Sequence, residues 1–177
     1  VSLVGCSGPH TAINGVEVLI ANEGVFPASL AGTWKAKNSS GWEITLLPDG
    51  TISSAVISLG GFRIIPGQTA KIPMKSKKES VIVPGLWHVY YKPEIRRLTV
   101  VLEQERIHVE IGDGVIEGKL TDVIDGIVSS DSMVWSGTWT IFLDAKTTTP
   151  EVQNFDMSTD PEYGESQEIT LVKVEDG

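Results

Sequence analysis

The feature that most constrains the fold of this chain is a period of two in its apolar residues, interrupted by short turn signals. Ile107 and Val109, for example, alternate with His108 and Glu110. Such alternation places apolar side chains on one face of a β-strand and polar side chains on the other. The pair Asp113-Gly114 follows at once, and this dipeptide is a strong hairpin signal. The pattern therefore predicts antiparallel strands joined by tight turns.

The same pattern extends along most of the chain. We expect strands at 32–38, 42–47, 51–58, 86–92, 97–103, 106–111, 115–124, 127–129, 133–143 and 168–174. Asp125-Gly126 is interpreted as a turn between two of them, and residues 13–22 fit either a strand or a short helix. Helical crossovers, which a parallel α/β sheet needs, are missing from the pattern. We predict an all-β fold, an antiparallel β-barrel or sandwich of about ten strands with a long acidic C-terminal loop.

Length and charge indicate one domain whose acidity is concentrated near the C-terminus. The chain has 177 residues and a formal net charge of −9, and a length of this order suits a single core. Eight of its 23 acidic residues lie in 151–177, where Lys173 is the only basic residue. We expect one β-domain at 25–177 that includes an irregular acidic segment at 145–167. An acidic chain repels phosphate backbones, so we expect no nucleic-acid partner.

The single cysteine lies in the run Leu3-Val4-Gly5-Cys6. This run resembles the lipobox of bacterial lipoproteins. The resemblance implies that residues 1–5 are a residual signal segment, that Cys6 is the lipid-attachment site, and that 6–24 form a tether and a first strand. It also implies an extracytoplasmic, membrane-anchored protein, and Ser7 in the next position favours the outer membrane or cell surface over the inner membrane. Lipidation would also consume the lone thiol.

A second motif begins at Gly32-Thr33-Trp34 and is followed by the turn Pro48-Asp49-Gly50. It resembles the opening of lipocalin- and avidin-like barrels, the calycins, in which the tryptophan plugs the closed end. The resemblance implies that role for Trp34, and Thr121-Asp122 lies near the spacing of a further lipocalin pair. The last strand offers Lys173 where lipocalins place an arginine across the tryptophan. Ala36 replaces the asparagine that avidins need, so biotin is not an expected ligand.

Two further tryptophans share one face of an expected strand. Trp135, Gly137 and Trp139 alternate, with Gly137 between the two rings. A gap between aromatic faces can accept a sugar ring or a planar apolar ligand. Trp34, Trp135, Gly137 and Trp139 are therefore the candidate ligand-binding or barrel-plug residues. The alternative is that the rings fill the core and that Gly137 lets the strand curve.

Sequence motifs for catalysis or metal binding are not found. There is no Gly-x-Ser-x-Gly elbow, and Cys6 is assigned to the anchor. His108 and Glu110 share a polar strand face, but a metal site needs three or four converging ligands. We expect neither an enzyme nor a metal or other cofactor.

Two functions remain open. One is a membrane-anchored structural or accessory subunit that binds a protein partner in an envelope complex. The other is a lipocalin-like carrier of a small apolar or planar ligand, which requires a cavity in the barrel.

Overall fold

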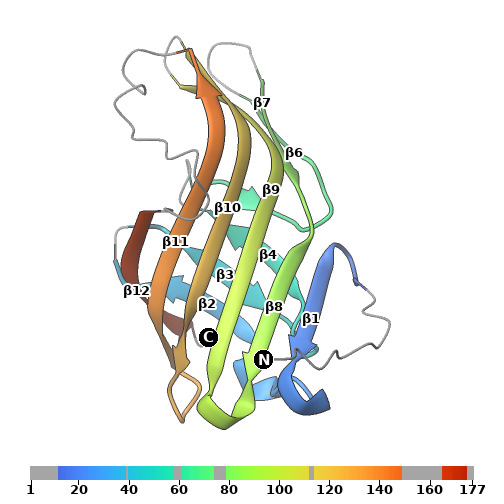
Figure 1. The fold of residues 1–177 in the computed structure, drawn as a ribbon, viewed down its shortest axis with the longest axis vertical. Coiled ribbons are helices and arrows are strands. Elements are labelled where there is room, and N and C mark those ends of the chain that lie inside the picture. Colours follow the sequence, from blue (N-terminus) through green and yellow to red (C-terminus); the bar gives the residue numbers. More distant parts are fainter. Residues whose placement is uncertain are drawn as a thin grey trace, which may run out of the picture.

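The structure is a computed structural model that describes residues 12–38, 40–57, 61–73, 79–111, 114–148 and 165–174. These residues form an all-β fold in which one strongly curled mixed sheet makes a half-barrel (Figure 1). The predicted fold class is confirmed. The strands are β1 (Val16–Ile20), β2 (Gly32–Ala36), β3 (Glu43–Leu46), β4 (Ile52–Val56), β5 (Arg63–Ile64), β6 (Ala70–Pro73), β7 (Glu79–Pro84), β8 (Trp87–Lys92), β9 (Arg97–Ile111), β10 (Gly114–Val128), β11 (Val134–Thr147) and β12 (Glu165–Val174). Three short 3₁₀ helices are η1 (Ala21–Glu23), η2 (Ala28–Leu30) and η3 (Pro93–Ile95).

The sheet places the last described strand beside the second one. Its strands follow the order β1-β8-β9-β10-β11-β12-β2-β3-β4-β5, and β6 and β7 extend it beside the second half of β9. β12 pairs antiparallel with β2, which places Lys173 opposite Trp34. β1 pairs in parallel with β8, and this pairing makes the sheet mixed. The strand β8 and the long strands β9 to β11 form one wall, with β2 to β4 crossing behind them (Figure 1).

Backbone next to two of the edge strands, β1 and β5, meets at a seam. They stand at opposite ends of the strand order, and hydrogen bonds between them are absent from the described ladder. The contact is made instead by backbone beside each strand: a Cβ on Gly15 would lie 2.8 Å from the backbone nitrogen of Gly67. Gly15 has a φ of +80° and Gly67 a φ of +71°, a region that only glycine adopts readily. The half-barrel is therefore completed by packing rather than by strand pairing.

Alternation along the strands builds the core. In β10, Leu120 and Ile124 are buried and face the interior, whereas Thr121 and Val123 between them face outward and are half-buried. The same period of two runs through the other strands of the wall and produces one buried apolar cluster. Four tryptophans, Trp34, Trp42, Trp87 and Trp135, are among its largest fully buried side chains.

The predicted strands at 97–103 and 106–111 are one strand, β9. Its pairing with β10 shifts register between Gly118 and Leu120. The shift lets Gln104 and Ile107, three positions apart, both face the interior, as their full burial shows. Such a bulge breaks the simple alternation without ending the strand, which is why the sequence pattern suggested two strands.

The predicted turn at Asp125-Gly126 is wrong, because both residues lie inside β10. Asp125 pairs with Thr99 and Thr138, and Gly126 pairs with Leu98 and Gly137. Neighbouring strands on both sides therefore satisfy this backbone. Pairing with β9 and β11 overrides the local turn preference of this dipeptide, which depends only on adjacent residues.

The predicted irregular segment at 145–167 begins and ends in strand. Ala145 to Thr147 complete β11, and Glu165 to Gln167 begin β12. Residues 149–164 between them, and Cys6 with its lipobox, lie outside the described residues. Within the described residues, no helix is long and apolar enough to cross a membrane.

Candidate functional site

Four of the tryptophans meet in pairs inside the half-barrel. Trp34 and Trp135 pack edge to face with ring centroids 6.2 Å apart, and Trp42 and Trp139 do the same at 5.4 Å. These distances and angles are those that aromatic quadrupoles favour. The structure thus brings three of the predicted site residues, Trp34, Trp135 and Trp139, into the interior, and it adds Trp42.

The first pair lies at one end of the interior, where Lys173 covers it. The Trp34 indole Nε1 donates to the Leu30 carbonyl at 3.0 Å, which ties the ring to η2. The Lys173 ammonium lies 5.7 Å from the Trp34 ring centroid, and it also donates to the Ala31 carbonyl at 3.4 Å and to the Ser29 carbonyl. A cation in this position is attracted by the face of the ring. The arrangement seals this end of the interior.

The space beside Gly137 is filled by the neighbouring strand. A Cβ at this position would lie 2.0 Å from the Asp125 carbonyl oxygen and 2.4 Å from the Gly126 Cα. Gly137 therefore allows close approach of β10 and β11. Trp135 and Trp139 lie on either side of it along β11, and each packs against a different tryptophan.

The interior also holds a carboxyl group. Asp122 is only 1% exposed, and its Oδ1 accepts a 2.8 Å hydrogen bond from the Trp139 indole. Its Oδ2 is buried and has no hydrogen-bond partner. Burial raises the pKa of Asp122 to about 7, although the bond from Trp139 opposes this shift. The Asp122 carboxyl group, which is ionised at neutral pH when it is exposed to water, is therefore close to half-protonated at neutral pH in the fold.

An amide side chain lies on the same inward face. Gln104 pairs with Leu120 on β10, two residues before Asp122, so the two polar side chains are diagonal neighbours across β9 and β10. Gln104 is fully buried, and neither its Oε1 nor its Nε2 has a partner. The Trp42 indole nitrogen is also buried and unpaired. We call Trp42, Gln104, Asp122 and Trp139 the interior polar cluster.

This cluster lies next to a half-buried stretch of the inward face of β11. Along the inward face of β11, Trp135 is 0% and Trp139 8% exposed, and Ile141 and Leu143 beyond them are half-buried. Asp122 pairs with Ile141 on this face. On β12 the trend is the same, because Leu171 and Ile169 are buried and Gln167 is exposed. Ile141 and Leu143 are therefore more exposed than Trp135 and Trp139, and Ala145 beyond them is buried again.

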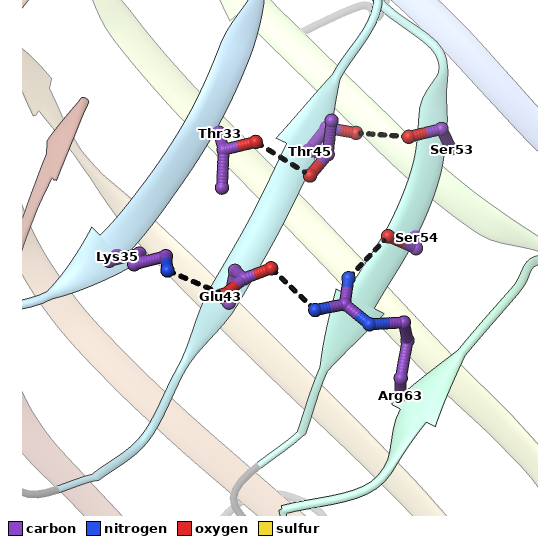
Figure 2. Close-up of polar contacts among 7 residues, drawn as sticks. All are labelled: Thr33, Lys35, Glu43, Thr45, Ser53, Ser54 and Arg63. Carbon is purple, nitrogen blue, oxygen red and sulfur yellow. Dashed lines mark hydrogen bonds and ion pairs between the residues drawn. The ribbon is translucent and has the colours of Figure 1, made fainter. Parts of the chain in front are cut away.

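A second set of polar contacts lies on the outer face of β2 to β5 (Figure 2). The Glu43 carboxylate lies 3.2 Å from the Lys35 ammonium and 2.7 Å from the Arg63 guanidinium, which also donates to the Ser54 hydroxyl at 2.9 Å. The bond from Arg63 is the main reason that the pKa of Glu43 is lowered. We call Lys35, Glu43, Ser54 and Arg63 the outer polar ladder. All four members are paired, and Arg63 ties the two-residue edge strand β5 to β3, so this ladder is structural.

The histidines considered for metal binding are separated. His88 on β8 lies 3.0 Å from the Glu17 carboxylate, whereas His108 on β9 lies 3.8 Å from Glu117. Among the described residues there is no group of three side chains that could hold a metal ion.

Sequence reasoning missed both central members of the interior polar cluster. Asp122 was noted only as part of Thr121-Asp122, and Gln104 was not noted. The signal was available for Asp122, because it occupies an inward position between Leu120 and Ile124. For Gln104 it was hidden, because the bulge after it breaks the alternation.

Comparison with protein-family models, curated proteins and solved structures gave no match. The functional argument therefore depends on the geometry of the chain itself.

Proposed function

We propose that this protein binds a small ligand inside its half-barrel, at the interior polar cluster. One observation carries the proposal: Asp122 and Gln104 bury polar atoms without partners in an otherwise apolar interior. Each such atom costs about 1–3 kcal/mol of stability, and natural proteins pair nearly all of them. A ligand that completes these hydrogen bonds explains why polar side chains occupy core positions.

The unpaired atoms indicate the chemistry of the ligand. Gln104 offers an acceptor oxygen and an amide nitrogen with two N–H donors, and the free oxygen of Asp122 accepts when ionised and either accepts or donates when protonated. The Trp42 indole adds a donor, and the Trp42 and Trp139 rings add aromatic surface. A planar, largely apolar molecule with a donor and an acceptor on one edge matches this set. We take the half-buried stretch at Ile141 and Leu143, beyond Trp139, as the entry route.

The sealed end supports a carrier of the lipocalin type. Trp34 is buried at that end and is bonded to η2, and Lys173 lies over its ring. Lipocalins place an arginine there, and Lys173 offers the same charge and a similar reach. An interior sealed at one end suits a protein that holds one ligand.

We further propose that the carrier is attached to the outside of a membrane through Cys6, as the lipobox resemblance implies. A role as an accessory subunit with a protein partner in the envelope stays a prediction from that anchor. Mass spectrometry of the protein extracted from its own membranes tests both ideas. A lipid-sized mass on a chain beginning at Cys6 supports the anchor, and an unmodified chain that retains residues 1–5 contradicts it.

Ligand binding is tested by native mass spectrometry of the full chain, purified gently from its own source. We expect a small-molecule adduct on the wild-type protein and its loss in Gln104→Leu and Asp122→Asn. Thr121→Val, on the outer face of the same strand, is the matched control and should keep the adduct. A wild-type protein without an adduct, or an adduct that both interior variants retain, contradicts the proposal.

A further inference from the structure

A groove lies on the opposite, outer face of the wall. It covers β8 to β11 and has a volume of about 570 Å³, open to solvent along one side. This volume falls within the roughly 300–1,000 Å³ that small-molecule sites occupy. Its walls include one tyrosine, two cations, one carboxylate and three threonines. The groove therefore presents these polar groups on a surface that also exposes aliphatic and aromatic carbon.

A row of four of these residues runs straight across the strands. Tyr90 pairs with Thr99, Thr99 pairs with Asp125, and Asp125 pairs with Thr138. The row thus crosses β8, β9, β10 and β11 at one level. Three strand spacings make it about 15 Å long. A ligand lying along the row would meet a hydrogen-bonding side chain or an aromatic ring at every strand.

The centre of the row is held in place. Arg97 donates to the Asp125 carboxylate from Nε at 2.9 Å and from Nη2 at 2.5 Å, and the Thr99 hydroxyl donates to it at 2.5 Å. The bonds from Arg97 are the main reason that the pKa of Asp125 is lowered. A two-pronged guanidinium–carboxylate pair is planar and geometrically specific. Donors and acceptors are therefore oriented before a ligand arrives, which lowers the entropy cost of binding.

The aromatic end of the row is also supported. The Tyr90 ring stacks on His88 with centroids 5.8 Å apart and planes 12° apart. His88 in turn lies 3.0 Å from the Glu17 carboxylate on β1. The Tyr90 ring is thus supported by its own strand β8 and, through His88, by β1, and it lines the groove.

We propose that this outer groove binds an extended oligosaccharide chain. A sugar unit has a face rich in C–H groups, which packs on an aromatic ring, and hydroxyls, which bond to threonines and to a fixed ion pair. The strand spacing of about 4.8 Å is close to the length of one unit in an extended chain, so successive units can meet successive strands. This inference is independent of the interior site.

Two other occupants fit less well. An extended peptide binds a sheet by adding a strand to a free edge, but β9, β10 and β11 already have a neighbour on each side over this stretch. A nucleic acid requires a strongly basic surface, whereas this groove contains the Asp125 carboxylate and the chain carries a net charge of −9. Oligosaccharide recognition needs side chains alone and no excess of positive charge.

The test is isothermal titration calorimetry of the full chain with four soluble probes: cello-, xylo- and manno-hexaose and a galacturonic acid hexamer. We expect binding of at least one probe, weakened about tenfold or more by Tyr90→Ala. Thr138→Arg places a large side chain at an exposed position of the row and should block binding without disturbing the core. Lys35→Ala, in the outer polar ladder, is the matched surface control and should bind like the wild-type protein.

The panel also reads the charge of the ligand. If the Lys92 ammonium contributes to binding, the galacturonic acid hexamer binds best and Lys92→Ala removes that preference. If the neutral hexamers bind equally well, the groove is assigned to neutral chains. Either pattern supports the proposal. Failure of the wild-type protein to bind all four probes overturns it, and so does binding that Tyr90→Ala and Thr138→Arg leave unchanged while circular dichroism shows that both variants are folded.

Discussion

Gly126 and Gly137 face each other across β10 and β11 so closely that neither position has room for a side chain. A Cβ on Gly126 would lie 2.3 Å from the Ser136 carbonyl oxygen, and one on Gly137 would lie 2.0 Å from the Asp125 carbonyl oxygen. The obstacles are backbone atoms, which cannot rotate away. This pair lies between the levels of Trp135 and Trp139 and brings the two long strands together there.

The first prediction concerns this close approach. Gly137→Ala should lower the free energy of unfolding by about 1–3 kcal/mol or more, because the added methyl must push β10 and β11 apart. Urea unfolding followed by tryptophan fluorescence measures the change. Gly85→Ala is the control, since a Cβ there meets only the flexible Glu103 side chain, at 3.1 Å. Equal effects of the two substitutions would show that the glycine pair is not tightly packed.

The second prediction concerns the pH dependence of stability through Asp122. Burial raises its pKa to about 7, whereas in the unfolded chain it titrates near about 4. Between these values the unfolded chain releases a proton that the folded protein keeps. The free energy of unfolding should therefore fall as pH rises, by about 1 kcal/mol per pH unit, and this component should level off above about pH 7.

Asp122→Asn removes that component. As pH rises from about 4 to about 7, the free energy of unfolding of the wild-type protein should fall relative to that of this variant. Urea titrations of both proteins across that range measure the difference. A difference that does not change with pH would mean that Asp122 is not desolvated.

The third prediction concerns the cost of the unpaired amide. Gln104→Leu should raise the free energy of unfolding of the ligand-free protein by about 1–3 kcal/mol, because it removes buried polar atoms that have no partner and leaves a side chain of similar size. Denaturant unfolding of ligand-stripped protein is the measurement. Destabilisation on this scale would instead indicate that Gln104 is satisfied in the folded state.

The fourth prediction concerns the sealed end. Lys173→Met should cost about 1 kcal/mol, because the methionine keeps the aliphatic cover over Trp34 but loses the cation. Lys173→Arg should restore most of that loss, since the guanidinium keeps the charge and stacks well on an indole. Thermal unfolding of the two variants separates these effects. If both substitutions cost the same, the charge over the ring has no role.

The fifth prediction concerns the outer polar ladder. Glu43→Gln should cost at most about 1 kcal/mol near neutral pH, since the contacts of Glu43 lie near the surface. The pKa of Glu43 is lowered in the fold, so its contribution is present above its ordinary pKa and is lost as pH falls through the lowered value. Unfolding of the variant and of the wild-type protein at about pH 7 and about pH 3 checks both statements.

The sequence predicts much of the fold because alternation is a local signal. The turn at Pro48-Asp49-Gly50 and the inward series Leu98, Val100 and Leu102 depend only on near neighbours in the chain. Asp125-Gly126 was misread because its strand partners, Thr138 and Gly137 on β11, are distant in sequence. A turn dipeptide has the same local preference whether or not a ladder encloses it.

The candidate site was predicted only in its aromatic part. Trp135 and Trp139 could be assigned to one face from their spacing, and Trp34 to the closed end from the calycin resemblance; all three are inside. The pairing of Trp42 with Trp139 arises only when β3 and β11 approach each other in the fold. That Asp122 is buried with one unpaired oxygen likewise depends on which side chains surround it in the fold, and composition cannot show this.

The seam between β1 and β5 has a consequence for the size of the interior. Widening this junction would break packing contacts near Gly15 and Gly67 but no rung of the described ladder. The two edges near Gly15 and Gly67 can therefore separate without breaking a hydrogen bond between paired strands. If the half-barrel widens to hold the proposed ligand, we expect this junction to open while the strand pairs on both sides of it stay hydrogen-bonded.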